Sequence, residues 1–277
     1  MSDRTPPGHG FPDAEFEARM ARAQAAMDRR GLDALVLTTP VDFRYFAVLD
    51  MQFWESPPRP WFLVAPREGA PVAVVPEIGA PGIEARTWIR DIRTWPAPRP
   101  DDDGVSLLAG VLAAVPARHG RIGMELGREM ALRMPVIDFL ALRDRLGGRE
   151  LVDGSPCIWE LRMVKSEAEI ARLRFVCAIA SDAYGAIAPA LAEGMTEREA
   201  ARALRIDLLG RGADAVPFLP AISGPGGVAQ IVCGPGERRL GLGELHQRRS
   251  RARTVQRRGR ALRRIDQGVD QRMQPRR

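Results

Sequence analysis

Lysine is almost absent from this chain of 277 residues: of its 41 basic residues, Lys165 is the single lysine and the rest are arginines. A GC-rich coding sequence is the simplest explanation of that bias, so the arginines are weak evidence for phosphate recognition. Cysteine is scarce too, with Cys157, Cys177 and Cys233 widely spaced along the chain. Three cysteines without a C-x-x-C pair argue against a disulfide framework and indicate a reducing compartment.

Long hydrophobic runs are also lacking. No segment approaches the roughly 18 consecutive apolar residues that a membrane span requires. The opening residues, M-S-D-R-T-P-P-G-H-G, are polar and contain no apolar core of a signal peptide. We therefore expect a soluble cytoplasmic protein without a membrane partner, in which residues 1–12 form a loose leader.

Residues 241–277 differ in composition from the rest of the chain. They hold 12 arginines but no lysine and no aromatic residue, and their only acids are Glu244, Asp266 and Asp270. This segment carries a net charge of +9. Since the whole chain carries +6, residues 1–240 carry −3. The high isoelectric point belongs to this arginine-rich tail, so it indicates nothing about partners of the folded body.

The first half of the chain alternates between helix and strand patterns. A helix is predicted from Asp13 to Gly31, with Phe16, Met20, Ala23 and Met27 on its apolar side. Short apolar runs predict strands at residues 33–39, 61–65, 72–75, 88–92 and 121–124, and further helices are predicted at 105–115 and 135–146. This alternation is typical of an α/β domain, which we place at residues 13–155.

Two capping boxes organise the region that follows. Ser166 and Glu169 predict the start of a helix that runs to Glu193, with Ile170, Leu173 and Cys177 on its inner side. Thr196 and Glu199 predict the start of a second helix ending near residue 209. A strand is expected at residues 216–222, and residues 156–240 are assigned to a second domain.

The same region resembles the creatinase, prolidase and aminopeptidase P family. The matching segments are E-L-R-M-V-K-S-E-A-E-I at 160–170 and G-M-T-E-R-E-A at 194–200, together with D-F-R-Y-F at 42–46. The resemblance spans roughly residues 13–240. It implies a creatinase-type N-terminal α/β domain followed by the first part of a pita-bread α+β catalytic domain, with a disordered or helical arginine-rich tail.

The resemblance to this family implies that the protein is a metal-dependent hydrolase of the Xaa-Pro peptidase type. Family members bind two divalent ions (Mn, Co or Zn) through two aspartates, one histidine and two glutamates, and the paired ions activate a bridging water. The implied substrate is a small peptide or a related small amide, and the implied assembly is a homodimer. Members of the creatinase or ectoine-hydrolase type act on small metabolites instead, and the sequence leaves that alternative open.

The resemblance ends before the segment in which family members carry their metal ligands. A family member would place its first aspartate motif near Gly243, where this chain reads G-E-L-H-Q-R-R-S-R-A-R. Glu244 occupies the place of the first acid, but no pair of aspartates follows. His246, Asp266 and Asp270 are interpreted as solvated groups among arginines. We therefore predict no catalytic residue, no metal ligand and no bound metal in this chain, and we interpret the tail as a frameshift or truncation near residue 240.

Trp54 and Arg59 are the only candidate substrate-binding residues. They belong to an aromatic and proline-rich stretch that includes Phe53 and Trp61. Packing of the aromatic side chains beneath the loop is the favoured interpretation. The resemblance adds a second one, in which Trp54 or Arg59 reaches the active site of a partner subunit.

The tail also supports a hypothesis of another class, a non-enzymatic binding protein. Leu262, Ile265, Val269 and Met273 lie near helical spacing among arginines, as in a basic amphipathic helix that binds nucleic acid. The absence of aromatic residues from the tail counts against stacking on single strands. A nucleic-acid partner is therefore the disfavoured alternative.

Overall fold

The computed structural model describes residues 7–8, 10–47, 60–224 and 233–241. These residues divide into an N-terminal unit, Gly8–Ser166, and a C-terminal unit that begins at Glu167. The division therefore lies after Ser166, whereas the sequence placed a domain boundary at residue 155. The reason is helix α6 (Ser155–Met163), whose Cys157, Ile158 and Leu161 are buried in the core of the N-terminal unit.

Helix α1 (Asp13–Arg30) forms as the sequence predicts. It begins after Pro12, and Gly31 ends it in the left-handed conformation, with φ of 62°. The predicted apolar side is buried, since Phe16, Met20 and Met27 are at most 4% exposed. Burial of this side against the sheet is what stabilises α1 in the protein.

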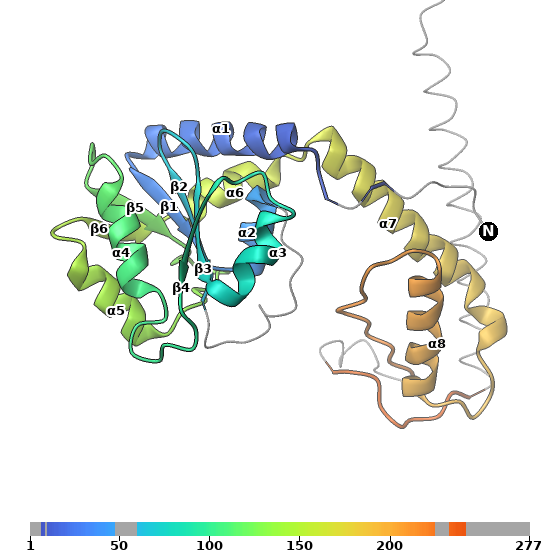
Figure 1. The fold of residues 1–277 in the computed structure, drawn as a ribbon. Coiled ribbons are helices and arrows are strands. Elements are labelled where there is room, and N and C mark those ends of the chain that lie inside the picture. The colour runs from blue at the N-terminus through green and yellow to red at the C-terminus, as the bar shows by residue number, and fades with distance from the viewer. Residues whose placement is uncertain (1–6, 9, 48–59, 225–232, 242–277) are drawn as a thin grey trace, which may run out of the picture. The chain divides into compact units, whose positions relative to one another are not determined.

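A six-stranded mixed sheet forms the centre of the N-terminal unit (Figure 1). Its order is β4-β3-β2-β1-β5-β6, with β1 Ala34–Leu37, β2 Phe62–Pro66, β3 Val72–Pro76, β4 Asp91–Trp95, β5 Arg121–Met124 and β6 Glu150–Asp153. Strand β2 pairs antiparallel with both of its neighbours, and all other pairs are parallel. The sequence predicted five of these strands but missed β6, and it placed β4 three residues too early. Trp88 is not in a strand; its indole N–H donates to the carbonyl of Phe46 at 2.7 Å.

Helices cover both faces of this sheet (Figure 1). Side chains alternate along β1, so Leu35 and Leu37 join one core and Val36 joins the other. The first core includes side chains of α1, α2 (Pro40–Phe46), α3 (Ala80–Glu84) and α6. The second core includes side chains of α4 (Val105–Ala114) and α5 (Val136–Arg145). The short η2 (Glu77–Gly79) precedes α3 directly. Trp61 is fully packed in the first core, where a Cβ atom on Gly79 would lie 2.1 Å from its ring.

The C-terminal unit contains α7 (Glu167–Ala186), the short η3 (Ala188–Ala190) and α8 (Glu197–Gly210). The capping box of α8 is confirmed, since Glu199 N–H donates to the Thr196 hydroxyl at 3.1 Å and the Glu199 carboxylate accepts from Thr196 N–H at 2.8 Å. Helix α7 ends at Ala186 rather than at Glu193, because Pro189 has no N–H to donate to the carbonyl four residues earlier, and Pro189 lies in the short η3 instead.

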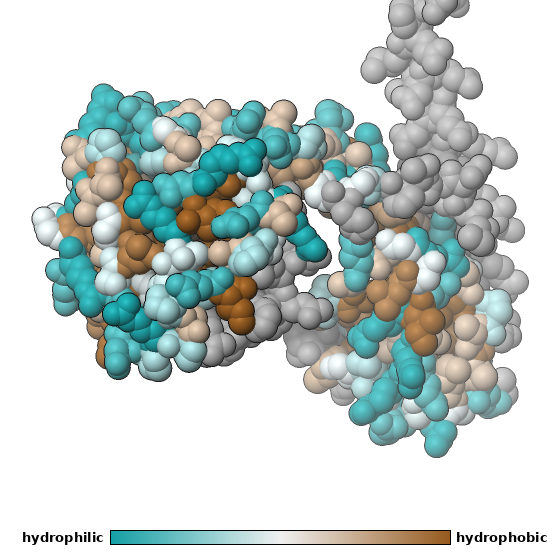
Figure 2. All heavy atoms as spheres, in the orientation of Figure 1, coloured by the Kyte–Doolittle hydropathy of each residue, from teal (hydrophilic) through white to brown (hydrophobic). Residues whose placement is uncertain are grey.

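Two further expectations for this unit are wrong. The strand at residues 216–222 does not form, since Pro217 and Pro220 have no N–H to donate to a neighbouring strand. Leu173 and Cys177 were placed on the inner side of α7, but Leu173 is 48% exposed and Cys177 is exposed. Hydrophobic side chains reach the surface of this unit (Figure 2). None of the helices in the described part of the chain combines the length and the hydropathy that a membrane crossing needs.

Candidate functional site

The carboxyl ends of β1 and β5 form the most distinctive edge of the sheet. The two strands are adjacent and parallel, yet β5 follows β1 only after three other strands have been placed on the opposite side. The chain leaves β1 for α2 on one face, and it leaves β5 for α5 on the other. Such a topological switch point is where open α/β sheets place their binding crevices.

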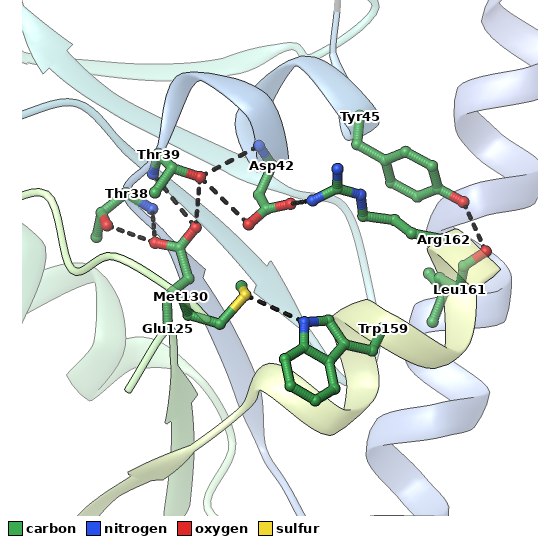
Figure 3. Close-up of polar contacts among 9 residues, drawn as sticks. All are labelled: Thr38, Thr39, Asp42, Tyr45, Glu125, Met130, Trp159, Leu161 and Arg162. Carbon is green, nitrogen blue, oxygen red and sulfur yellow. Dashed lines mark hydrogen bonds and ion pairs between the residues drawn. The ribbon is translucent and has the colours of Figure 1, made fainter. Parts of the chain in front are cut away.

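Polar side chains from both strand ends meet there (Figure 3). Thr38 and Thr39 follow β1, and Glu125 follows β5. The Glu125 carboxylate accepts from Thr38 N–H at 2.7 Å, from Thr39 N–H at 3.3 Å and from the Thr39 hydroxyl at 2.7 Å. The Thr38 hydroxyl donates to it as well. Glu125 is only 1% exposed, so these donors replace the water that its carboxylate has lost.

A second carboxylate lies beside this cluster. Asp42 of α2 receives a hydrogen bond from the Thr39 hydroxyl at 3.2 Å, while its own N–H is capped by that hydroxyl at 3.3 Å. Its other oxygen accepts from the guanidinium of Arg162 on α6 at 2.7 Å. The Asp42 side chain is 3% exposed and that of Arg162 is 40% exposed. The ion pair therefore bridges a buried acid and a basic side chain at the surface.

Arg162 and Asp42 come from two segments that carried the family resemblance, and they are 120 residues apart in sequence. Tyr45, from the same D-F-R-Y-F segment as Asp42, donates its hydroxyl to the carbonyl of Leu161 at 3.1 Å. The sequence identified these segments by motif but gave no reason to join them. The structure shows that they fasten α6 to α2.

The electrostatics of Glu125 differ from those of an ordinary surface glutamate. Burial, the largest cause, raises the pKa of its carboxyl group, and a hydrogen bond to Asp42 adds to the effect. Hydrogen bonds from Thr38 and Thr39 act in the opposite direction, and together these effects raise the pKa of Glu125 to about 7. A carboxyl group with this pKa can hold a proton at neutral pH, but its buried oxygens accept hydrogen bonds from protein donors.

Glu125 is the residue that the sequence interpretation missed. The available signal was its position directly after the buried strand R-I-G-M, beside the Thr-Thr pair that follows β1. In an α/β sheet, polar residues after adjacent parallel strands gather at one edge. The sequence could not show that β1 and β5 are adjacent, because strands β2, β3 and β4 separate them along the chain.

The C-terminal unit holds a buried carboxylate of another kind. Glu197 accepts from Ser223 N–H and from the Ser223 hydroxyl, both at 2.6 Å, and from Gly236 N–H at 3.0 Å. Burial by itself would raise the pKa of Glu197, but these hydrogen bonds and nearby Arg238 outweigh it, so the pKa is lowered. Glu197 thus fastens the loop around Ser223 and the segment around Gly236 to the start of α8.

The described residues do not fit a two-metal centre. Among them, no group of three or more histidine, cysteine, aspartate or glutamate side chains is placed to hold a metal ion. The buried carboxylates of Glu125, Asp42 and Glu197 already accept hydrogen bonds from protein groups. The acids and histidine of the tail, Glu244, His246, Asp266 and Asp270, lie outside the described residues, as do the candidate substrate-binding residues Trp54 and Arg59.

Two curated proteins are similar to this chain. Agropine synthesis cyclase of Rhizobium rhizogenes is 30% identical over 193 residues, which is 67% of this chain and 46% of that protein. The uncharacterized hydrolase/peptidase y4tM of Sinorhizobium fredii is 27% identical over 169 residues, covering 59% of this chain and 42% of that protein. The chain therefore spans less than half the length of these two relatives.

The solved structure of dipeptidase PepE from Mycobacterium ulcerans has the same fold. Its TM-score is 0.64 and its sequence identity is 26%, over 84% of this chain and 59% of that one. The model of the creatinase/prolidase N-terminal domain matches residues 19–164, which is more than half of the chain and nearly all of the N-terminal unit. The sheet, the helices on its two faces and this match agree, and the chain belongs to the creatinase/prolidase N-terminal domain family.

Proposed function

We propose that this chain is the amino-terminal part of a metal-dependent hydrolase that cleaves an Xaa-Pro peptide bond or a related small amide C–N bond. The observation that carries the proposal is the extent of the likeness to dipeptidase PepE. It covers 84% of this chain, or about 233 of 277 residues, whereas the family model covers the 146 residues from 19 to 164. The likeness therefore extends into the C-terminal unit, where such a hydrolase builds its catalytic domain.

The N-terminal unit contributes shape to this proposed enzyme rather than reacting groups. Its polar cluster is occupied by internal hydrogen bonds, and its two cores are closed. When two divalent ions are bound, they supply a water-derived nucleophile and polarise the scissile carbonyl. The ligands for such ions belong to segments that the arginine-rich tail replaces in this sequence. We accordingly propose that the 277-residue chain itself is inactive.

Other parts of the proposal rest on the resemblance alone. The proposed setting is the cytoplasm, and the proposed assembly is a homodimer. Trp54 and Arg59 are proposed to contact substrate in that assembly. Within the chain we propose a creatinase-like domain, the beginning of a pita-bread domain and an aberrant tail from residue 241.

A second candidate is an enzyme that acts on a small metabolite without a peptide bond. It is favoured by the 30% identity to a protein named agropine synthesis cyclase, which is higher than the 26% identity to dipeptidase PepE. Both candidates share the N-terminal unit. Their difference lies in substrate selection, which the described residues do not contain.

The first test is a reading of the DNA downstream of codon 240. If the tail is a frameshift, one of the other two frames will encode a pair of aspartates followed by histidine and glutamate motifs. If neither frame does, the frameshift interpretation fails. The residues that line the substrate in such a recovered frame would also separate the peptidase from the metabolite enzyme.

The second test is an assay of the purified 277-residue chain with Xaa-Pro dipeptides and added Mn²⁺ or Co²⁺. We expect no hydrolysis above a control without protein. Hydrolysis that a chelator abolishes would contradict the proposed inactivity and show that the chain holds a working metal site.

A further inference from the structure

Glu125 and Asp42 compete for a single hydrogen atom. The Thr39 hydroxyl lies 2.7 Å from an oxygen of Glu125 and 3.2 Å from an oxygen of Asp42. A hydroxyl has one hydrogen to donate, so it can serve only one of these two carboxylates at a time. Its choice depends on whether Glu125 carries a proton of its own.

Three polar contacts of α6 reach the segments that carry the two acids (Figure 3). Glu160 of the same helix pairs instead with Arg29 and Arg30 of α1. Arg162 pairs with Asp42 at 2.7 Å, and the Leu161 carbonyl accepts from the Tyr45 hydroxyl at 3.1 Å. The Trp159 indole N–H donates to the sulfur of Met130 at 3.2 Å. Met130 lies five residues after Glu125 on the segment that leaves β5. A change around Glu125 therefore has a direct path to α6.

We propose that Glu125, Thr39, Asp42 and Arg162 form a proton-operated latch that sets how firmly the last turn of α6 is held on the N-terminal unit. The latch is tighter when Glu125 is ionised and looser when Glu125 is protonated. Because α6 is the last helix before the C-terminal unit begins at Glu167, the latch acts where the chain leaves the N-terminal unit.

The proton steps follow from the donors at hand. A protonated Glu125 donates its O–H to Asp42, either directly or through the Thr39 hydroxyl, which then donates to Asp42 in turn. Asp42 thereby gains a donor that competes with Arg162 for the negative charge of its carboxylate. Loss of the proton returns the Thr39 hydroxyl to Glu125, so Asp42 loses that competing donor. Arg162 then has a second negative charge nearby, which strengthens its ion pair with Asp42. The surrounding groups place this change at a pKa of about 7 for Glu125.

Other charged groups on the surrounding elements set the background for this titration. Arg133, before α5, donates its backbone N–H to the Thr38 hydroxyl at 2.9 Å. Asp153, at the end of β6, accepts from Ser155 N–H at 2.9 Å. Arg22 of α1 donates to the Tyr45 hydroxyl at 3.3 Å. Glu125 is the group of this cluster whose pKa is raised to about 7.

The test is a pH titration of the 277-residue chain labelled with 5-fluorotryptophan. The fluorine signal of Trp159, assigned with Trp159→Phe, reports the surroundings of α6. We expect this signal to move with a midpoint near pH 7. We also expect Glu125→Gln to abolish the movement, since the Gln amide donates to Thr39 at every pH. Glu84→Gln, at an exposed position on α3, is the matched control and should keep the wild-type midpoint.

A second variant separates a latch from an isolated buried acid. Arg162→Met leaves the charge of Asp42 unopposed, which disfavours ionisation of Glu125 and should move the midpoint upward by about half a pH unit or more. Arg143→Met, on the exposed side of α5, should leave it in place. The comparison of Arg162→Met with Arg143→Met tests the latch even if Glu125→Gln fails to fold.

Three results would overturn the proposal. The first is a Trp159 signal that does not change between pH 6 and 8. The second is a change that persists in Glu125→Gln, because it would come from another group such as a histidine. The third is a midpoint that Arg162→Met leaves unaltered, because Glu125 and the Arg162 pair would then be independent.

Discussion

The two units of this chain use similar helices but bury them to very different extents. In the N-terminal unit α1 presents an apolar side that is covered, and two clusters of buried side chains fill both faces of the sheet. In the C-terminal unit the 20-residue helix α7 buries only Ile179 and Ala183, and the buried cluster there comprises Leu191 and Leu240. Amphipathic sequence thus specifies a helix, while its stability depends on what covers the apolar side.

Separating the two units should produce the largest difference in thermal unfolding, and it is the strongest test of this contrast in burial. We expect the chain cut after Ser166 to unfold cooperatively on heating, because both of its cores lie before that residue. Residues 167–277 alone should show no cooperative transition, since the described residues of that stretch bury little apolar surface. Circular dichroism melting curves measure both. A cooperative transition in residues 167–277 would show that this unit has a core of its own.

A matched pair of leucine substitutions sharpens the comparison. Leu63 on β2 is 0% exposed, and Leu173 on α7 is 48% exposed. Leu63→Ala should lower the free energy of unfolding by about 2–5 kcal/mol, because it removes buried contacts and leaves a cavity. Leu173→Ala should change it by less than about 0.5 kcal/mol. Urea denaturation of the two variants gives both values, and equal losses would contradict the contrast between the units.

The two buried glutamates should respond to pH with opposite signs. The folded-state pKa of Glu125 is raised from 4.5 to about 7, so the native state binds more protons than the unfolded state between those values. Its contribution to stability is therefore full below pH 4.5 and falls as the pH rises through 7, by about 3 kcal/mol in all. Urea midpoints measured from pH 5 to 8 should decline in the wild type. They should decline less in Glu125→Gln, and parallel curves would refute the effect.

Glu197 should behave in the reverse way, because its folded-state pKa is lowered. Its contribution is present above the unfolded pKa and is lost as the pH falls through the folded one. The observable is protection of the Ser223 and Gly236 amides from hydrogen exchange, since both donate to Glu197. We expect Glu197→Gln to weaken this protection already at neutral pH. Protection that is unchanged in the variant would show that other contacts hold this loop.

The smallest expected effect concerns the capping box of α8. Thr196→Ala removes the hydroxyl that accepts from Glu199 N–H, which should cost about 1 kcal/mol of helix stability. Thr196→Ser keeps that hydroxyl and is the control. Far-ultraviolet circular dichroism should show helix loss in the alanine variant alone. Equal spectra for both variants would mean that contacts from residues 236–240 hold α8 without its cap.

Local signals explain how much of the fold was predictable. Helix α1 was placed correctly because Pro12, Gly31 and its apolar periodicity all act within one segment. Helices α2 and α6 were missed, since they are short and their apolar residues lack a clear period. Strand 216–222 was predicted from its apolar residues although Pro217 and Pro220 opposed it. For the candidate site, the sequence drew attention to Asp42 and Arg162 only as motif positions and did not identify Glu125.

The sequence by itself determined the order of most helices and strands, the family resemblance and the unusual charge of residues 241–277. These properties depend on residues close together in the chain, where spacing and capping are visible. Only the tertiary structure decided that β5 lies beside β1, and that Glu125, Asp42 and Arg162 therefore share one buried network. The pKa of Glu125 follows from that network, because burial and neighbouring charge arise from residues that only folding brings together.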